Sequence, residues 1–162
     1  MDYYSTNREH LAKWEPNRDA DFYTHKYWER WIGEVRESAE AGTTCHFVAF
    51  SPADDLERVA GVCNLTNISR GVFQACIMGY SIGAVYSGRG LMREIVSEVV
   101  TYAFNTLELH RVMANHMPEN ERSARVLADL GFQREGLAQS YLKIGGRWRD
   151  HILTAKINPR HL

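Results

Sequence analysis

The chain has 162 residues, of which 44% are hydrophobic and 24% charged, and its formal net charge is −1. This composition predicts one globular domain over residues 1–162 and excludes general disorder, while the small net charge argues against direct nucleic-acid binding. No stretch approaches the roughly 20 apolar residues of a membrane span, and the first ten residues lack a secretory signal pattern. We therefore expect a cytoplasmic protein without a membrane partner, present as a monomer or homodimer.

The N-terminal part of the sequence predicts helices. Residues 5–13 suggest a short helix that ends before Trp14-Glu15-Pro16. A second helical pattern opens at Asp21 and ends at Gly42, a residue type that commonly terminates helices. Apolar residues recur between them at helical spacing: Tyr27, Trp28, Trp31, Ile32, Val35 and Ala39.

Strand-like runs follow, separated by short turns. Residues 44–50, 59–65 and 72–82 are rich in apolar and β-branched residues and read as three strands. Residues 51–55 and 67–71 carry the Pro, Asp, Asn and Gly residues typical of turns. Such short connections predict an antiparallel meander.

The second half of the chain alternates helices and strands. The expected elements are a helix from Leu91 to Leu107, a strand over 110–116, a helix over 120–130, and strands over 132–144 and 147–157 joined by Gly145-Gly146. After the first helices the order is βββ-α-β-α-ββ. This order predicts an α+β fold, with a mixed sheet flanked by helices.

The cysteines do not form a recognisable site. Cys45, Cys63 and Cys76 lie far apart and include no CxxC pair or close Cys/His cluster. Each lies in an apolar stretch, so we expect small buried hydrophobes, with no disulfide framework and no metal site.

Charge is unevenly distributed along the chain. Residues 1–50 hold 6 Lys/Arg and 9 Asp/Glu, a net of −3, whereas residues 101–162 hold 9 and 6, a net of +3. Chance surface charge explains this imbalance. The imbalance would also suit a cationic ligand near the N-terminal third and an anionic ligand on the C-terminal half.

The segment YSIGAVYSGRGLMREIV, residues 80–96, is the most informative one. A strand leads into a small-residue loop and then directly into a long helix. Such a junction points free backbone N–H groups and the positive end of the helix dipole at one place. Gly88 and Gly90 allow a ligand to approach the backbone closely. The junction therefore suits a phosphate or pyrophosphate.

Two common phosphate motifs do not match this loop. A P-loop needs Lys-Ser/Thr after its glycines, and a dinucleotide fingerprint needs a third glycine where Arg93 stands, within a repeated βαβ unit. The loop instead resembles the acyl-coenzyme A loop of the GNAT N-acetyltransferases, [QR]xxGx[GA]. Gly88 and Gly90 match that pattern, while Val85 occupies its Gln/Arg position.

A second segment strengthens this resemblance. In ANHMPENERSARVLADLGF, residues 114–132, Asn120 and Ser123 stand at the motif's Asn and small-residue positions, and Leu130-Gly131-Phe132 closes the helix. The chain is similar over nearly its whole length to the RimJ/RimL family of ribosomal-protein-alanine N-acetyltransferases, nearest to its RimJ branch, and four stretches carry the resemblance: NREHLAKWEP, GYSIGAVYSGRGLM, HRVMANHMPENERS and GRWRDHILTA. The resemblance implies the GNAT fold. Only six residues precede Asn7, so we expect the usual first strand to be lacking.

The resemblance implies acetyl-CoA as the cofactor and direct transfer of its acetyl group to an amine. Backbone groups around Tyr80, Ser81 and Ile82 would hold the pantetheine and polarise the thioester carbonyl. The pyrophosphate would be surrounded by Val85, Ser87, Gly88, Arg89, Gly90 and Leu91. Arg89 or Arg93 would add positive charge beside the pyrophosphate, and a plain solvated helix face explains either residue equally well. For Asn120, a contact with pantetheine and a helix cap are both open.

The resemblance also implies catalytic candidates. Many GNAT enzymes protonate the leaving thiolate with a Tyr, but the matching position here is Ala128. Ser123 is the alternative, although a first-turn Ser that bonds the local backbone is an equally open interpretation. Related enzymes carry a carboxylate where Asn115 stands, and an amide is no base. His116 is expected to point to the opposite face of its strand.

The absence of a strong base favours an α-amine acceptor. An α-amine has a pKa of about 7.7–8.0, whereas lysine, at about 10.4, would need roughly 2.5 pK units more help. We expect Trp14, Glu15, Tyr141 and Asp150 to line the acceptor site, with Trp148 more typical of core packing. For Glu15, a surface carboxylate beside a core Trp is an equally open interpretation. The resemblance implies acetylation of the N-terminal alanine of a ribosomal protein. A small-amine acetyltransferase acting on a polyamine, aminoglycoside or amino acid, and a non-catalytic acyl-CoA-binding or ribosome-assembly module, are the alternatives.

Overall fold

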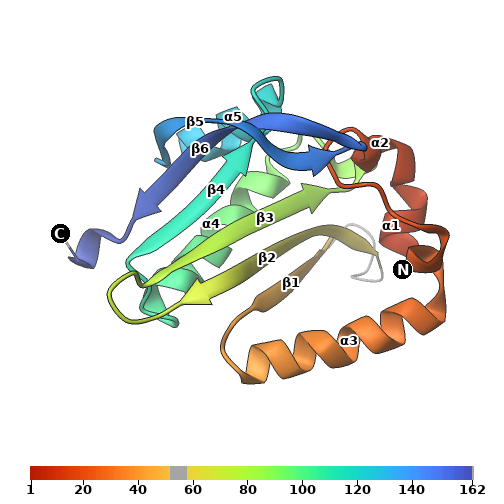
Figure 1. The fold of residues 1–162 in the computed structure, drawn as a ribbon, viewed down its shortest axis with the longest axis horizontal. Helices are drawn as coiled ribbons and strands as arrows, with labels where there is room; N and C mark the ends of the chain where they lie inside the picture. Colours follow the sequence, from red (N-terminus) through yellow and green to blue (C-terminus); the bar gives the residue numbers. More distant parts are fainter. Residues whose placement is uncertain (52–57, 162) are drawn as a thin grey trace.

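The computed structural model describes residues 1–51 and 58–161 (Figure 1). Apart from the three-residue turns η3 and η4, its helical elements are α1 (Asp2–Thr6), α2 (Arg8–Ala12), η1 (Ala20–Tyr23), α3 (His25–Glu40), α4 (Leu91–Asn105) and α5 (Glu121–Asp129). The turn expected over residues 51–55 lies almost wholly outside the described residues.

Six strands form one mixed sheet in the order β1-β2-β3-β4-β6-β5. The strands are β1 (Cys45–Phe50), β2 (Val59–Ser69), β3 (Ala75–Ile82), β4 (Arg111–His116), β5 (Gln133–Ile144) and β6 (Arg147–Ile157). All neighbours are antiparallel except β3 and β4, which are parallel. This confirms the predicted α+β class and the element order of the second half. Within the described residues, no strand precedes β1, so β1 is a sheet edge.

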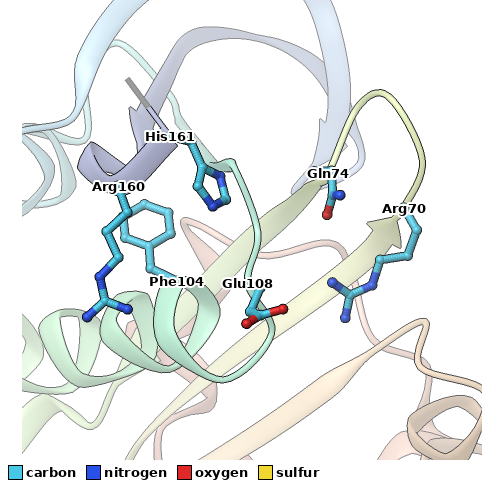
Figure 2. Close-up of a pocket in the computed structure, with 6 residues that line it drawn as sticks. All are labelled: Arg70, Gln74, Phe104, Glu108, Arg160 and His161. Atoms are coloured by element: carbon cyan, nitrogen blue, oxygen red, sulfur yellow. The ribbon is translucent and has the colours of Figure 1, made fainter.

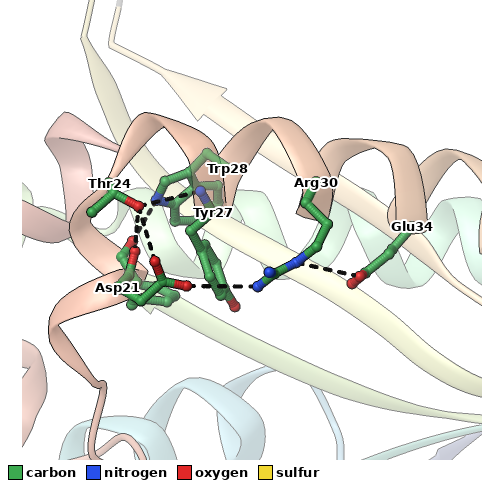
Figure 3. Close-up of polar contacts among 7 residues, drawn as sticks. Asp21, Thr24, Tyr27, Trp28, Arg30 and Glu34 are labelled. Atoms are coloured by element: carbon green, nitrogen blue, oxygen red, sulfur yellow. Dashed lines mark hydrogen bonds and ion pairs between the residues drawn. The ribbon is translucent and has the colours of Figure 1, made fainter.

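The N-terminal helices differ from the predicted ones. The expected helix over 5–13 is two short helices that meet at Asn7, whose φ of −104° departs from helical geometry. The long helix α3 begins at His25 rather than Asp21, because Thr24 is its N-cap and accepts from the Tyr27 N–H at 3.2 Å. Asp21 stays outside the helix, where its carbonyl accepts from the Thr24 hydroxyl at 2.7 Å, as Figure 3 shows.

Two strand ends also differ from the prediction. β2 continues past Leu65 to Ser69, and β3 starts at Ala75 rather than Val72. The register shifts between Thr66 and Ser69, where Asn67 takes a left-handed φ of 50°. Asn tolerates that conformation, so the chain bulges there and turns later.

The core lies between the sheet and α4, which runs behind β2, β3 and β4 in Figure 1. Fully buried side chains from both layers meet there: Cys63, Leu65, Cys76, Val96, Ala103 and Val112. The three cysteines are free; Cys63 and Cys76 are buried as predicted, whereas Cys45 on the edge strand β1 is only half-buried. Burial raises the pKa of Cys63 and of Cys76 to about 12, so both thiols stay neutral and pack as small apolar groups.

His46 on the edge strand β1 gives the fold a pH dependence. Its Nδ1 is buried and has no hydrogen-bond partner among the described residues, and its ring packs edge-on against Trp31 with centroids 5.2 Å apart. Burial lowers the pKa of His46, although a hydrogen bond with Asn64 acts in the opposite direction. Below about pH 6.5 the imidazole of His46 therefore binds a proton more readily in the unfolded chain than in the folded one. The contribution of this histidine is intact above about pH 6.5 and is lost as the pH falls below that value.

We therefore expect His46→Gln to flatten the loss of unfolding free energy on acidification. The measurement is urea denaturation at several pH values on either side of about 6.5. His25→Gln, at an exposed position, is the matched control. If both variants keep the wild-type slope, the buried imidazole is not its source.

Candidate active site

The pairing between the two parallel strands stops early. Ala75–Ile77 pairs with Arg111–Met113, yet β3 continues to Ile82 and β4 to His116. The other edge of β3 stays paired with β2, and the other edge of β4 with β6. The two strands therefore diverge. A wedge opens between the facing backbone edges of residues 78–82 in β3 and residues 114–116 in β4. Backbone N–H and C=O groups there are available to a ligand that carries amide groups.

The loop before α4 opens directly beside this wedge. Gly88 and Gly90 have left-handed φ angles of 79° and 84°. A Cβ built on either glycine would meet no heavy atom within 4 Å. The first N–H groups of a helix have no intrahelical partner, and no side chain caps α4. The result is a cradle of free N–H groups at the positive end of a 15-residue helix.

Arginines add positive charge around this cradle. Arg89 and Arg93 are exposed in the loop and the first turn of α4. Arg122, in the first turn of α5, donates from Nη1 to Ser87 Oγ at 3.2 Å. Sequence reasoning missed Arg122, because its role depends on α5 starting next to the loop. Val85, at the motif's Gln/Arg position, is 67% exposed.

Tyr80 and Ser123 form a hydroxyl pair across the wedge. Their oxygens are 2.7 Å apart and join β3 to the start of α5. Asn120 is the N-cap of α5, with Oδ1 accepting from the Ser123 N–H at 3.2 Å. The Ser123 hydroxyl therefore bonds the Tyr80 phenol rather than a local carbonyl. The phenol side chain of Tyr80 was not foreseen, since only its backbone was expected to matter.

Asn115 of β4 and Tyr141 of β5 lie close together on the face of the sheet opposite to the core. Asn115 Nδ2 lies 3.5 Å from the Tyr141 hydroxyl. Tyr141 lies in an irregular stretch of β5 between Ala138 and Leu142, where Ser140 has a φ of 47°. Asp150 Oδ1 accepts from the Ser140 N–H at 2.8 Å and holds this bulge. Asp150 thus acts on the backbone that carries Tyr141.

The N-terminal helices reach the end of β3 and the turn that follows it through two part-buried polar contacts. The Tyr3 hydroxyl lies 3.0 Å from Ser81 Oγ, and burial raises the pKa of Tyr3 above its usual range. Asn7 is 9% exposed. Its Nδ2 donates to the Tyr3 carbonyl and its Oδ1 accepts from the Ala84 N–H, both at 2.8 Å. No periodicity in the sequence marks either residue, so both were missed.

Comparison with known proteins identifies this arrangement. The family model described as an acetyltransferase (GNAT) domain matches residues 1–133. The chain belongs to the GNAT acetyltransferase family. It is 44% identical over 158 residues to the [ribosomal protein uS5]-alanine N-acetyltransferase of Escherichia coli K12, covering 98% of this chain and 80% of that protein.

Solved structures agree with this assignment. The ribosomal-protein-S5-alanine acetyltransferase of Vibrio fischeri has a TM-score of 0.93 and 40% identity, covering 98% of this chain and 85% of that one. RimJ of Mycobacterium smegmatis in complex with CoA-disulfide has a TM-score of 0.87 and 29% identity, covering 96% and 74%. The resemblance to the RimJ/RimL family and the predicted GNAT fold are confirmed.

As a GNAT member, the protein is an acetyltransferase that uses acetyl-CoA. The wedge and the cradle fit that molecule. The unpaired edge of β3 offers partners for the amides of pantetheine, and the N–H groups at the start of α4 suit a pyrophosphate. When bound, acetyl-CoA supplies an acetyl group activated as a thioester.

Polar groups stand on both faces of the wedge. Side chains alternate along a strand, so Tyr80 and Ser81 point to opposite faces. Tyr80 meets Ser123 on the face covered by α4 and α5, whereas Ser81 meets Tyr3 of the N-terminal helices. Hydroxyl groups therefore lie on both faces of β3 where it borders the wedge.

Trp14 and Glu15 lie next to the tip of the β5–β6 hairpin, where the Gly145 N–H donates to the Glu15 carbonyl at 3.3 Å. The Glu15 carboxylate pairs with Arg18 at 3.3 Å. Within the described ranges, no hydrogen bond, ion pair or ring contact joins Trp14 or Glu15 to the Asn115–Tyr141 pair. Trp148, for which core packing was the favoured role, is 64% exposed, so that expectation was wrong.

A cavity of about 450 Å³ in the described structure is not part of this site. It lies at the opposite end of the sheet, near the C-terminus (Figures 1 and 2). Its lining comes from the β2–β3 turn, the end of α4, the following loop and the C-terminal turn: Arg70, Gln74, Phe104, Glu108, Arg160 and His161. A second hollow of about 350 Å³ is lined by Tyr4, Arg8, Glu15 and Tyr23, among others.

Two classes of feature are not found in the described residues. No group of three or more His, Cys, Asp or Glu side chains there is arranged to hold a metal ion. None of the described helices is long and apolar enough to cross a membrane.

Proposed function

We propose that this protein acetylates the N-terminal α-amine of an alanine, and that its acceptor is ribosomal protein uS5. The observation that carries this assignment is the 44% identity to the uS5-alanine enzyme across nearly the whole chain. Such an acceptor places the reaction in the cytoplasm, where ribosomes are assembled.

The donor side uses mainly backbone groups. Tyr80, Ser81 and Ile82 present the free edge of β3 to the pantetheine. The loop from Val85 and Ser87 through Gly88, Arg89 and Gly90 to Leu91 surrounds the pyrophosphate, and Asn120 holds the helix that carries Ser123. The open space beside both glycines and the uncapped helix start support these roles.

The acceptor amine approaches from the Asn115–Tyr141 face. Asn115 acts as a hydrogen-bond partner that orients the amine, because an amide does not take up a proton at neutral pH. An α-amine with a pKa of about 7.7–8.0 is already partly neutral, so water can remove its proton. Trp14, Glu15, Tyr141 and Asp150 shape this side, Asp150 by fixing the bulge that carries Tyr141.

Ser123 is the residue that donates a hydrogen bond to the departing sulfur. Its hydroxyl lies at the open end of the wedge, and its only hydrogen-bond partner in the described part of the chain is Tyr80. Holding amine and thioester together supplies the proximity on which direct transfer depends.

The test compares CoA release with three acceptors: a peptide with a free N-terminal alanine, the same peptide with a blocked N-terminus and a lysine, and spermidine. We expect turnover with the free alanine and at least about 100-fold less turnover at lysine. The pKa of lysine is higher by roughly 2.5 units, so a much smaller fraction of its amine is neutral. Faster turnover of spermidine would instead identify a small-amine acetyltransferase. CoA binding without any turnover would identify a non-catalytic module.

A further inference from the structure

The pair formed by Tyr80 and Ser123 has one proton to spare. The two oxygens are 2.7 Å apart, and each hydroxyl carries one proton. One proton fills the bond between them. Within residues 1–51 and 58–161, neither hydroxyl has another hydrogen-bond partner, so the second proton is free to meet a ligand in the wedge.

The chemistry of the two groups decides which proton is free. A phenol, with an ordinary pKa of about 10, is a stronger donor than an aliphatic hydroxyl. The Tyr80 ring packs against the core beneath α4 and is held there. Ser123 stands in the first turn of α5, one residue after Arg122, which contacts the loop that precedes α4. If the Tyr80 phenol donates to Ser123 Oγ, the Ser123 proton is the one that remains free to face the wedge.

We propose that Tyr80 is a positioning residue whose phenol donates to Ser123 Oγ and so directs the Ser123 hydroxyl proton toward the sulfur of CoA. This inference rests on the proposed role of Ser123 in acetyl transfer. Substituting Tyr80 then acts through Ser123 and leaves the acceptor face unchanged.

The departing sulfur needs only a hydrogen bond, and no proton transfer from Tyr80. The amine nitrogen bonds to the acetyl carbon as the C–S bond breaks, the electron pair of that bond stays on sulfur, and the amine proton leaves to water. Burial raises the pKa of Tyr80 to about 12, whereas an ordinary thiol has a pKa of about 8.5. Tyr80 therefore keeps its proton, and the sulfur is stabilised as an anion that accepts a hydrogen bond.

The test reads the bound sulfur directly and needs no acceptor. The affinities of CoA and desulfo-CoA are measured by calorimetry below and above about pH 8.5, the pKa of an ordinary thiol. Desulfo-CoA corrects for titration of the protein itself, including Cys63, which acts on Tyr80 and whose pKa burial raises to about 12. In the wild type we expect the preference for CoA to rise about ten-fold with pH, the value of one charge-assisted hydrogen bond.

Tyr80→Phe and Ser123→Ala should each remove most of this rise, and the double variant should lose no more than either single one. Tyr80→Phe should also lower kcat about three- to ten-fold with the KM for acetyl-CoA unchanged. Tyr102→Phe, another tyrosine packed against the same core, is the matched control and should keep the wild-type values.

Three outcomes overturn the proposal. If Tyr80→Phe keeps the rise that Ser123→Ala loses, Ser123 needs no positioning. If Ser123→Ala keeps the rise that Tyr80→Phe loses, the phenol itself faces the sulfur. If the wild type shows no rise, the sulfur does not meet this pair. A failure of the proposed function is distinguishable, because it appears as missing turnover of the alanine peptide with the CoA measurements intact.

Discussion

Gly90→Ala is expected to weaken CoA binding about ten-fold or more, equivalent to about 1.4 kcal/mol. Gly90 is the N-cap of α4 and has a φ of 84°, a left-handed conformation that costs an alanine about 1–2 kcal/mol. A Cβ there meets no heavy atom of residues 1–51 and 58–161 within 4 Å, so it would occupy the space beside the free N–H groups. Anions bound at helix starts come close to those N–H groups. The measurement is calorimetric titration with CoA.

Gly42→Ala separates backbone strain from ligand contact. Gly42 follows α3, has a φ of 69° and also has open space around it. Its alanine variant should lose a similar amount of unfolding free energy and still bind CoA as the wild type does. Equal CoA affinities in the two variants would show that Gly90 matters only for folding and that the cradle lies elsewhere.

The glycine loop and the elements on either side of it could be predicted because their signal is local. A strand, a glycine loop and an amphipathic helix follow one another within residues 80–96, and backbone N–H groups need no distant partner to face a ligand. The same holds for Asn120, whose capping role depends on Ser123 three residues later. Local order of this kind also predicted the helices and strands of the second half, with β6 at its observed bounds.

The side-chain contacts of the site could not be predicted in the same way, because they join residues far apart in sequence. Tyr3 and Ser81 are 78 positions apart, and Tyr80 and Ser123 are 43 apart. No spacing rule connects such pairs. The early end of the β3–β4 pairing is equally invisible, since both strands keep their strand pattern to the end. The sequence thus located the glycine loop for which we propose pyrophosphate binding, and the structure was needed to show which hydroxyls border the wedge.

Asn7→Ala is expected to destabilise the protein by about 2–4 kcal/mol, because it removes two hydrogen bonds and leaves a part-buried N–H without a partner. It should also raise the Kd for CoA about ten-fold, a loss of about 1.4 kcal/mol in binding free energy. The cause is the loss of the hydrogen bond that holds the Ala84 backbone, just before the glycine loop. Asn7 is the link between the Tyr3 carbonyl and the Ala84 N–H, at the turn that leads into the glycine loop. Chemical denaturation and CoA titration measure the two effects separately.

Asn158→Ala is the control that makes this prediction specific. Asn158 is 1% exposed, and its Nδ2 donates to the carbonyls of Phe104 and Leu109 at 3.4 and 3.0 Å, at the opposite end of the sheet. Its loss should cost similar stability without changing the CoA affinity, provided that both variants are titrated below their melting temperatures. If the two variants bind CoA equally, Asn7 only holds the fold. If only Asn7→Ala weakens binding, the N-terminal helices that border the acceptor face also set the position of the donor loop.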